Sequence, residues 1–453
     1  MNNIKGLKIV SKANSNIENN PKSKENATVK SKVVVSILGI QGGYIDDKKE
    51  AKFTNFENKA DYIFESVTKE FFNTLPLLIE KYAATHKIIP IFTEDAKIFN
   101  KAVLDKGYPS LSLDFMEDYY IKDDKNFEDI FKIINQAISS YNEVIVDVSH
   151  GFRHLPILMI VDLIIQNFQD TSKISKILFA KEIKRHEKDS KGLYEIIDLK
   201  EYLDLANISF VLTTFAKNYT VASHIKSEKY NDLIEKLNSF SNDLMALNQN
   251  NLFRKTSKEL IKALDKIEDI SIKNQADDLK KDIVKLTDHE GKKRYETYYN
   301  LAKDLYEKKY MLLSLSLLYE SIRLYVKTYI KNKENGKYKV LVENIENQFN
   351  NDLYKIGDFF KNLKWKTYKQ LLNDKKTIIS ISEANYQKLK NSFPNGLKEL
   401  YDKIDRKRNN LAHANSDNKT FQDIESDIKK LFDEYYEKCI KKQDIADLKK
   451  KFM

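Results

Sequence analysis

The sequence predicts an N-terminal α/β domain with a doubly wound, mostly parallel sheet, followed by an all-helical connector and an all-α C-terminal domain. Short β-branched runs alternate with helical patterns from residue 32 to about residue 217, and such alternation is typical of a parallel sheet covered on both faces. After about residue 200 no convincing strand pattern remains. The chain of 453 residues has only 6 Pro and 11 Gly, which leaves room for long uninterrupted helices.

The first half of the alternating region predicts three strands and two helices. Val33–Leu38 is short and β-branched, so it predicts a buried strand. Ala60–Ala84 carries apolar residues at helical spacing and predicts a helix. Lys87–Phe92 predicts the second strand, and a helix is expected to begin at Thr93-Glu94-Asp95. Leu111–Phe115 predicts a third, short strand.

The second half continues the alternation with two helices and three strands. Helical apolar spacing predicts helices over Phe127–Tyr141 and Leu155–Phe168. Glu143–Val148 predicts the strand between them. Ile174–Ala180 and Leu193–Ile197 close the series, and the second of them could form a hairpin with the first.

Four regions are therefore expected along the chain. Residues 1–31 are polar and predict a disordered segment. Residues 32–220 form the α/β domain, and the Lys-, Asp-, Glu- and Asn-rich residues 221–292 form a helical connector. Residues 293–453 form the C-terminal helical domain, whose first long helix is predicted over Tyr295–Ile330.

Composition and charge restrict the classes of function. The net charge is +10, which fits a nucleic-acid partner, although a Lys-rich chain also arises from genome base composition. The single Cys439 excludes an intrachain disulfide framework and a Cys-based zinc site. We expect no metal or cofactor, because the histidines lack metal-ligand spacing. No apolar run is long enough to span a membrane and no signal peptide is evident, so a cytoplasmic protein without membrane contact is expected.

The most informative motif is Asp147-Val148-Ser149-His150-Gly151-Phe152-Arg153, between a predicted strand and a predicted helix. Such turns bind ligands in open α/β sheets, because the helix N-terminus offers N–H groups and Gly allows close backbone approach. Taken singly, Asp147 could brace the turn, Ser149 could cap the helix and His150 could be a hydrogen-bonded loop residue. Together these residues predict a ligand site.

Two other strand ends are expected to face the same crevice. Gly39-Ile40-Gln41-Gly42-Gly43-Tyr44 follows the first strand, where its glycines permit close approach to phosphate and Gln41 or Tyr44 could contact a base. Thr93-Glu94 follows the second strand, where the pair could equally be a simple helix cap. Three loops at the carboxyl ends of parallel strands are together stronger evidence for a common ligand site than any single loop.

A second candidate site is Arg408-Asn409-Asn410-Leu411-Ala412-His413. Arg408 continues a helical apolar stripe that is formed by Leu397, Leu400, Tyr401 and Ile404. A charged side chain on this inward-facing stripe suggests a cleft or a partner subunit. The chemistry that fits is metal-free RNA cleavage, in which His moves a proton and Arg stabilises the charge on the phosphorus centre. The alternative is an Arg–His surface pair at the end of a helix.

At these residues the chain resembles the CRISPR-associated CARF–HEPN ribonucleases of type III systems, particularly the branch named for an Asp-x-Thr-His-Gly motif. Asp147-Val148-Ser149-His150-Gly151 matches that motif with Ser in place of Thr. Phe92-Thr93-Glu94-Asp95-Ala96 is similar to the second-strand signature of the family, and Arg408…His413 matches its Arg-x4–6-His motif. Arg406 offers a second spacing, but Arg408 is preferred. The resemblance covers roughly residues 32–220 and 293–453.

The resemblance implies a Rossmann-like CARF domain that dimerises and binds a cyclic oligoadenylate, and a HEPN domain that cleaves single-stranded RNA to a 2′,3′-cyclic phosphate. Arg408 and His413 would carry the chemistry, with Asn409 supporting them. The activator is expected to be cyclic tetra-adenylate, although the sequence leaves its ring size open. Its expected contacts are Gly39, Ile40, Gln41, Gly42, Thr93, Glu94, Asp147, Ser149, His150, Gly151, Phe152 and Arg153.

The leading hypothesis is thus an antiviral endoribonuclease that acts as a homodimer or a higher homo-oligomer and is activated by a cyclic oligoadenylate. Two alternatives remain open. The first is a nucleotide-sensing protein that only dimerises or recruits a partner. The second is a stand-alone HEPN toxin, which would cleave RNA without an activator.

Overall fold

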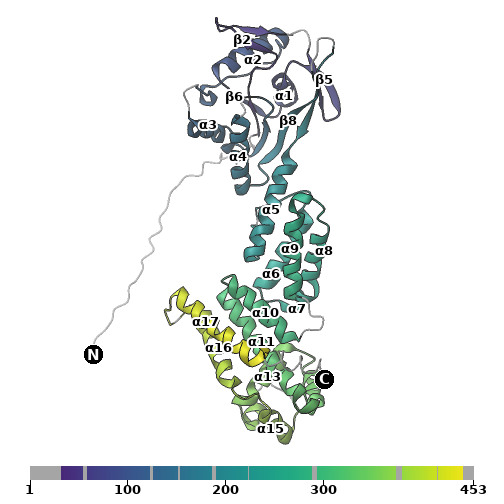
Figure 1. Cartoon of the computed structure of the whole chain (residues 1–453), viewed down its shortest axis with the longest axis vertical. Coiled ribbons are helices and arrows are strands. Elements are labelled where there is room, and N and C mark those ends of the chain that lie inside the picture. The colour runs from purple at the N-terminus through teal and green to yellow at the C-terminus, as the bar shows by residue number, and fades with distance from the viewer. Residues whose placement is uncertain are drawn as a thin grey trace, which may run out of the picture. The chain divides into compact units, whose positions relative to one another are not determined.

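The structure is a computed structural model that describes residues 32–54, 59–122, 126–151, 154–185, 190–222, 224–287, 293–373, 380–415 and 417–441. The expected disordered segment 1–31 lies outside the described residues. The chain divides into two compact units (Figure 1). The first comprises the chain as far as Asn167 together with Ser172–Lys200, and the second comprises Phe168–Thr171 and the chain from Glu201 onward.

The first unit is built on a seven-stranded, mostly parallel sheet of order β5-β4-β9-β8-β7-β1-β6. Strand β1 lies between β6 and β7 and is parallel to both, and β8 is parallel to β7. Strand β9 pairs antiparallel with β8, which confirms the predicted hairpin. Its strands are β1 (Lys32–Ile37), β4 (Ala60–Phe64), β5 (Val67–Phe71), β6 (Lys87–Ile91), β7 (Glu143–Asp147), β8 (Ile174–Lys184) and β9 (Leu193–Asp198).

Helices and a small ribbon cover this sheet. The apolar side chains of α1 pack in one buried cluster with Val34 of β1 and Ile145 of β7. The two-stranded ribbon packs its Phe53 ring against Phe72 and Phe99. These elements are α1 (Thr74–Tyr82), α2 (Glu94–Gly107), η1 (Glu117–Tyr119), α3 (Phe127–Ser139), α4 (His154–Gln169), and the ribbon strands β2 (Gly43–Ile45) and β3 (Ala51–Phe53).

The helix predicted over Ala60–Ala84 is wrong for its first half. That stretch forms the hairpin β4–β5, and only Thr74–Tyr82 is helical. The turn residues Glu65 and Ser66 have φ values of 50° and 66°, the left-handed conformation that a two-residue hairpin turn requires. Neither residue is Gly or Asn, so the usual turn signal is missing. Pairing with β9 decides the strand conformation of β4.

The strand predicted over Leu111–Phe115 is also wrong, because residues 111–116 take no regular conformation. The position beside the end of β6 is occupied by Tyr120, which forms an isolated parallel bridge with Phe92. Phe115 instead packs its ring edge-on against Phe92, with 5.2 Å between the ring centroids. Phe115, one of the apolar residues that suggested a strand, therefore packs its side chain against the end of β6 without pairing with it.

The regular elements among the described residues of the second unit are all helices. One buried apolar cluster runs from Ile208 to Cys439, so the residues expected as a connector share a core with the C-terminal helices. The helices are α5 (Lys200–Asn218), α6 (Asn231–Met245), α7 (Gln249–Asn251), the π-helical η2 (Leu252–Thr256), α8 (Ser257–Asp265), α9 (Ile270–Thr287), α10 (Arg294–Glu307), α11 (Met311–Gly336), α12 (Lys339–Gln348), α13 (Leu353–Trp365), α14 (Tyr368–Leu372), α15 (Glu383–Asn391), α16 (Leu397–Ala412), α17 (Phe421–Tyr435) and the π-helical η3 (Tyr436–Ile440).

The long helix predicted over Tyr295–Ile330 is broken into α10 and α11. Lys309, between them, has a φ of 68°, and the chain reverses there. The Ser314 hydroxyl donates to the Ala302 carbonyl at 2.8 Å and the Ser321 hydroxyl to the Tyr295 carbonyl at 2.6 Å, which ties the two helices antiparallel. The turn has neither Gly nor Pro, so the helical pattern runs through it without interruption.

Within the described ranges, no helix combines the length and the apolar character that a membrane crossing requires.

Candidate functional sites

A cavity of about 600 Å³ lies in the first unit. It opens at the carboxyl ends of β1, β6 and β7, which are neighbours in the sheet. All three predicted loops contribute to its wall, as crossover connections in a parallel sheet require. The residues that line it are Leu38, Gly39, Ile40, Gln41, Lys49, Thr93, Glu94, Asp95, Ala96, Ser149, His150, Gly151, Ala180, Glu182 and Tyr194.

Eight of the predicted ligand residues therefore lie together, and two do not. Gly42 and Asp147 are absent from the lining. Phe152 and Arg153 lie outside the described residues. Strands β8 and β9 also contribute to the lining, chiefly through Glu182 and Tyr194. These two residues were not predicted, because a strand pattern alone does not show which side chains face a cavity.

Asp147 braces the loop from below the cavity. Its side chain is buried, and one carboxylate oxygen accepts hydrogen bonds from the Ser36 and Thr74 hydroxyls at 2.8 and 2.9 Å. The other oxygen accepts from the Ser149 backbone N–H at 3.0 Å and from its hydroxyl at 2.5 Å. The Ser149 hydroxyl in turn accepts from the Ala180 N–H at 2.8 Å, which ties the loop to β8. Both side chains thus hold the turn in place, the first of the roles considered for Asp147.

Two glycines allow the first and third loops to pack against each other. A Cβ on Gly39 would lie 2.7 Å from the backbone nitrogen of Gly151. Gly151 has a φ of +99°, and a Cβ there would lie 2.5 Å from Cγ2 of Ile37. The Asn100 amide donates to the Gly39 carbonyl at 2.9 Å and fixes that loop. A side chain at Gly39 would therefore push the two loops apart, and one at Gly151 would push the third loop away from β1.

Two residues of the cavity lining have buried polar atoms without partners in the described part of the chain. The Gln41 Oε1 and His150 Nε2 atoms are buried and have no hydrogen-bond partner among the described residues, and both residues line the cavity. Burial lowers the pKa of His150 below its usual value, against the opposing effect of the Asp147 charge, so the imidazole is neutral at pH 7. Buried polar groups normally find a partner. A ligand with hydrogen-bonding edges would satisfy both.

Thr93 has two roles in the structure. Its hydroxyl accepts from the Ala96 N–H at 3.4 Å, so it is the N-cap of α2. Thr93 and Glu94 also line the cavity, so the beginning of α2 faces the space that a ligand would occupy. The cap that the sequence suggested is therefore present at the cavity wall.

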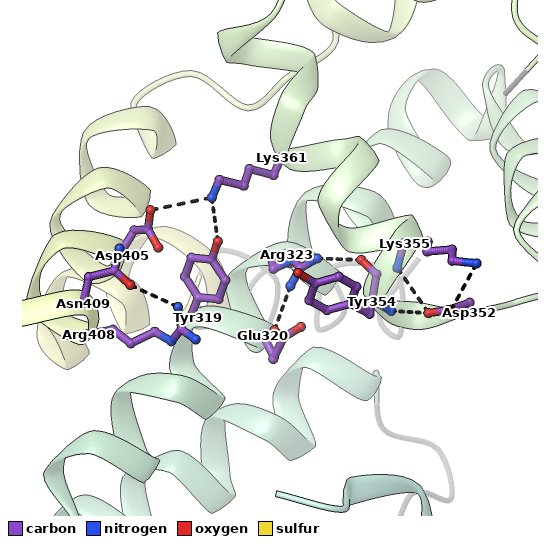
Figure 2. Close-up of polar contacts among 10 residues, drawn as sticks. All are labelled: Tyr319, Glu320, Arg323, Asp352, Tyr354, Lys355, Lys361, Asp405, Arg408 and Asn409. Atoms are coloured by element: carbon purple, nitrogen blue, oxygen red, sulfur yellow. Dashed lines mark hydrogen bonds and ion pairs between the residues drawn. The ribbon is translucent and has the colours of Figure 1, made fainter. Parts of the chain in front are cut away.

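Arg408 lies in the second unit and faces a different cavity, of about 890 Å³. The four stripe residues that precede it on α16 are buried, as predicted, and Arg408 itself is half-buried. Its guanidinium lies over the Tyr319 ring, 5.1 Å from the centroid, and donates to Asn409 Oδ1 at 3.2 Å (Figure 2). Stacking on an aromatic face holds a guanidinium in place while leaving its donors available.

Tyr319 is the centre of a cationic cluster on α11 and its neighbours. Lys361 of α13 donates to the Tyr319 hydroxyl at 2.7 Å and lies 3.6 Å from Asp405 of α16 (Figure 2). Arg323 is buried, lies 5.5 Å from the Tyr319 centroid and pairs with Glu320 at 2.8 Å. Burial raises the pKa of Glu320, although the nearby arginines act in the opposite direction. The apolar pattern of α11 gave no sign of this cluster.

His413 is placed apart from the cavity that Arg408 lines. It is the C-cap of α16 and is exposed, and its backbone N–H donates to the Asn409 and Asn410 carbonyls at 3.0 and 3.2 Å. Asn409 is exposed as well. The single chain therefore positions Arg408 at a cavity wall and His413 at an exposed helix end.

No group of three or more His, Cys, Asp or Glu side chains that could hold a metal ion occurs among the residues described. The wall of the 890 Å³ cavity contains amides, arginines, tyrosines and carboxylates with cationic partners, which suits an organic anion or a nucleotide. No protein-family model matches this chain, and no curated protein matches its sequence.

Proposed function

We propose that this protein is a metal-independent endoribonuclease that cleaves single-stranded RNA and is activated by a cyclic oligoadenylate. The first unit would be the CARF-type sensor and the second the HEPN-type nuclease. The observation that carries the proposal is the 600 Å³ cavity, where three separate loops meet and two lining residues, Gln41 and His150, have buried polar atoms without hydrogen-bond partners among the described residues.

The cavity has the chemistry of a nucleotide site. The Gln41 carbonyl oxygen can accept from the adenine amino group, and the neutral His150 can bond to a base or ribose. Gly39 and Gly151 line the cavity without side chains, so their backbone can approach a phosphate. The cavity volume lies within the ordinary range for ligand pockets. A symmetric cyclic ligand, cyclic tetra-adenylate in our proposal, suits a two-fold dimer in which two such cavities face each other.

The proposed cleavage needs a proton acceptor, a proton donor and a charge stabiliser. The ribose 2′-oxygen attacks phosphorus, the bond to the 5′-oxygen breaks, and the products are a 2′,3′-cyclic phosphate and a 5′-hydroxyl. His413 takes the 2′-hydroxyl proton or supplies the proton to the leaving oxygen, and Arg408 stabilises the charge on the phosphoryl oxygens. Because His413 is exposed at a helix end, we propose that two copies complete the site together.

The test is cleavage of a fluorescent single-stranded RNA in EDTA, with and without cyclic tri-, tetra- and hexa-adenylate. We expect cleavage with cyclic tetra-adenylate only, and its loss in His413→Ala with ligand binding retained. His224→Ala is the matched control, since His224 is also exposed in the second unit. Normal cleavage by His413→Ala would contradict the catalytic role proposed for His413.

A second candidate is a nucleotide sensor that dimerises or recruits a partner without cutting RNA. The separation of His413 from the cavity of Arg408 favours it. Isothermal titration calorimetry distinguishes the two candidates. Binding of cyclic tetra-adenylate that is lost in His150→Ala, combined with no cleavage under any condition, would support the sensor.

A further inference from the structure

Three of the seven arginines in the chain converge on the 890 Å³ cavity of the second unit. Arg254 comes from the π-helical turn η2, Arg294 is the first residue of α10, and Arg408 comes from α16. They are far apart in the sequence and belong to no common motif. Tertiary packing alone brings them to one wall.

The carboxylates of the same cavity already have cationic partners. Glu320, Glu346 and Asp352 line it, and each lies within ion-pair distance of a Lys or Arg side chain (Figure 2 shows the first and the last). In the same order, the partners are Arg323 at 2.8 Å, Lys327 and Lys331 at 2.6 and 3.1 Å, and Lys355 at 3.9 Å. The direct ion-pair partners of these acids are therefore cations other than the three arginines of the lining, and one of the three, Arg408, acts on Glu320 through its charge.

Arg254 and Arg294 keep their charges available. Arg294 donates to Asn250 Oδ1 at 3.2 Å and lies over the Tyr298 ring, 5.8 Å from its centroid. Arg254 is exposed on η2. Across the part of the chain that the structure describes, neither guanidinium forms an ion pair with a carboxylate. The cavity wall thus carries a positive surplus that suits an anion.

The remaining lining suits a nucleic-acid strand rather than a free inorganic anion. Five amide side chains and two tyrosines accompany the arginines; of the two tyrosines, Tyr354 is 70% exposed and its ring is available for stacking, whereas Tyr298 is buried. Amides bond to base edges and tyrosine rings stack on bases, the combination found in grooves for single strands. These lining residues are Asn248, Gln249, Asn250, Asn350, Asn351, Tyr298 and Tyr354.

We propose that Arg254 and Arg294 bind backbone phosphates of the RNA substrate on either side of the phosphate that Arg408 contacts. This inference rests on the proposed function, because it takes Arg408 as the mark of the reacting phosphate. Arg254 and Arg294 hold the strand and take no part in the proton transfers. Their loss therefore weakens RNA binding, with a smaller salt dependence, whether or not the chemical step proceeds.

The experiment measures binding of a fluorescein-labelled single-stranded RNA by anisotropy on the full chain with cyclic tetra-adenylate present. The RNA is 2′-O-methylated at every position, so it lacks the attacking hydroxyl and stays intact. Arg254→Gln and Arg294→Gln are each expected to weaken binding about tenfold, the usual loss for a charge-assisted hydrogen bond. Each is also expected to reduce the slope of log affinity against log salt by about 0.7, the value for one phosphate of a single strand.

Two matched controls carry the same loss of charge. Lys255→Gln alters the exposed neighbour of Arg254 and Lys398→Gln alters an exposed residue on the same helix as Arg408, and neither side chain lines this cavity. Both controls are expected to bind within about twofold of the wild type, the ordinary effect of one screened surface charge. Arg254→Lys and Arg294→Lys should recover most of the affinity, which a purely structural role would not predict.

The outcomes separate this inference from the proposed function. One outcome is that both Gln variants bind RNA more weakly than the controls while the wild type cleaves no RNA. That outcome would support the phosphate site and contradict the proposed nuclease activity. Wild-type affinity in both Gln variants, losses equal to those of the controls, or no RNA binding by the wild type would each overturn the inference. Helical circular dichroism of every variant should match the wild type.

Discussion

Neighbouring residues of one motif have opposite roles in this protein. Asp147 is buried and bonds to two hydroxyls that lie 111 and 73 positions away in the chain, whereas His150 lines the cavity and its buried Nε2 has no hydrogen-bond partner among the described residues. A linear motif cannot separate these roles, because the donors to Asp147 come from β1 and the start of α1. In our proposal, Asp147 therefore supports ligand binding indirectly, by holding the loop that lines the cavity.

We expect Asp147→Ala to destabilise the first unit by about 3 kcal/mol. The change leaves the buried hydroxyls of Ser36 and Thr74 and the Ser149 N–H without their acceptor, and each unsatisfied buried donor costs about 1–3 kcal/mol. Urea unfolding measures the loss. Asp105→Ala, on the exposed side of α2, should stay within about 0.5 kcal/mol of the wild type. Equal effects of the two changes would contradict the bracing role.

The pH dependence of stability should report the burial of His150. Its folded pKa lies below the usual value of about 6.5, despite the Asp147 charge beside it. The unfolded chain therefore binds more protons than the folded chain as pH falls below that value, and stability is lost toward acid. The contribution is at most about 1.4 kcal/mol per pH unit. His150→Gln should lose less stability than the wild type between pH 7 and pH 5, and parallel curves would contradict this account.

At the scale of elements, α11 supports α16 at the second site. Tyr319 of α11 provides the aromatic face on which Arg408 of α16 lies, and Lys361 of α13 holds the Tyr319 hydroxyl (Figure 2). The sequence predicted the apolar stripe of α16 and the inward position of Arg408. The supporting ring belongs to Tyr319, which precedes Arg408 by 89 positions in the chain. Hydrophobic periodicity carries no information about which helices pack together.

We expect Tyr319→Leu to lower RNA cleavage about tenfold and Tyr319→Phe to retain most of it. Phe keeps the ring under Arg408 and loses only the hydroxyl, whereas Leu removes a cation–π contact worth about 0.5–2 kcal/mol. Single-turnover cleavage with cyclic tetra-adenylate is the measurement, and melting temperatures control for the buried position of Tyr319. Cleavage by the Leu variant equal to that of the Phe variant would contradict a supporting role for the ring.

At the scale of the whole molecule, the two units have separate apolar cores. One cluster contains Val34, Tyr62 and Ile145 of the sheet, and another runs from Ile208 through the helices to Cys439. The 600 Å³ cavity lies within the first unit and the three-arginine cavity within the second. Units with independent cores commonly unfold independently.

Differential scanning calorimetry of the full chain should therefore show two transitions. Cyclic tetra-adenylate binds the folded first unit in our proposal, so it should raise the midpoint temperature of one transition. At a ligand concentration about one hundred times Kd, it should stabilise that unit against unfolding by about 2.7 kcal/mol. The other transition should move less. A single transition that shifts as a whole would contradict the independence of the two cores.

The sequence by itself determined the mostly parallel sheet, the helical second half, the three loops at the strand ends and the inward position of Arg408, because hydrophobic periodicity and strand–helix alternation are local signals. It did not determine the β4–β5 hairpin or the break between α10 and α11, where left-handed turns at Glu65, Ser66 and Lys309 carry no Gly signal. Only the tertiary structure decided the burial of Asp147 and the meeting of Arg254, Arg294 and Arg408. Those features depend on contacts between residues distant in the chain, for which one sequence holds no local pattern.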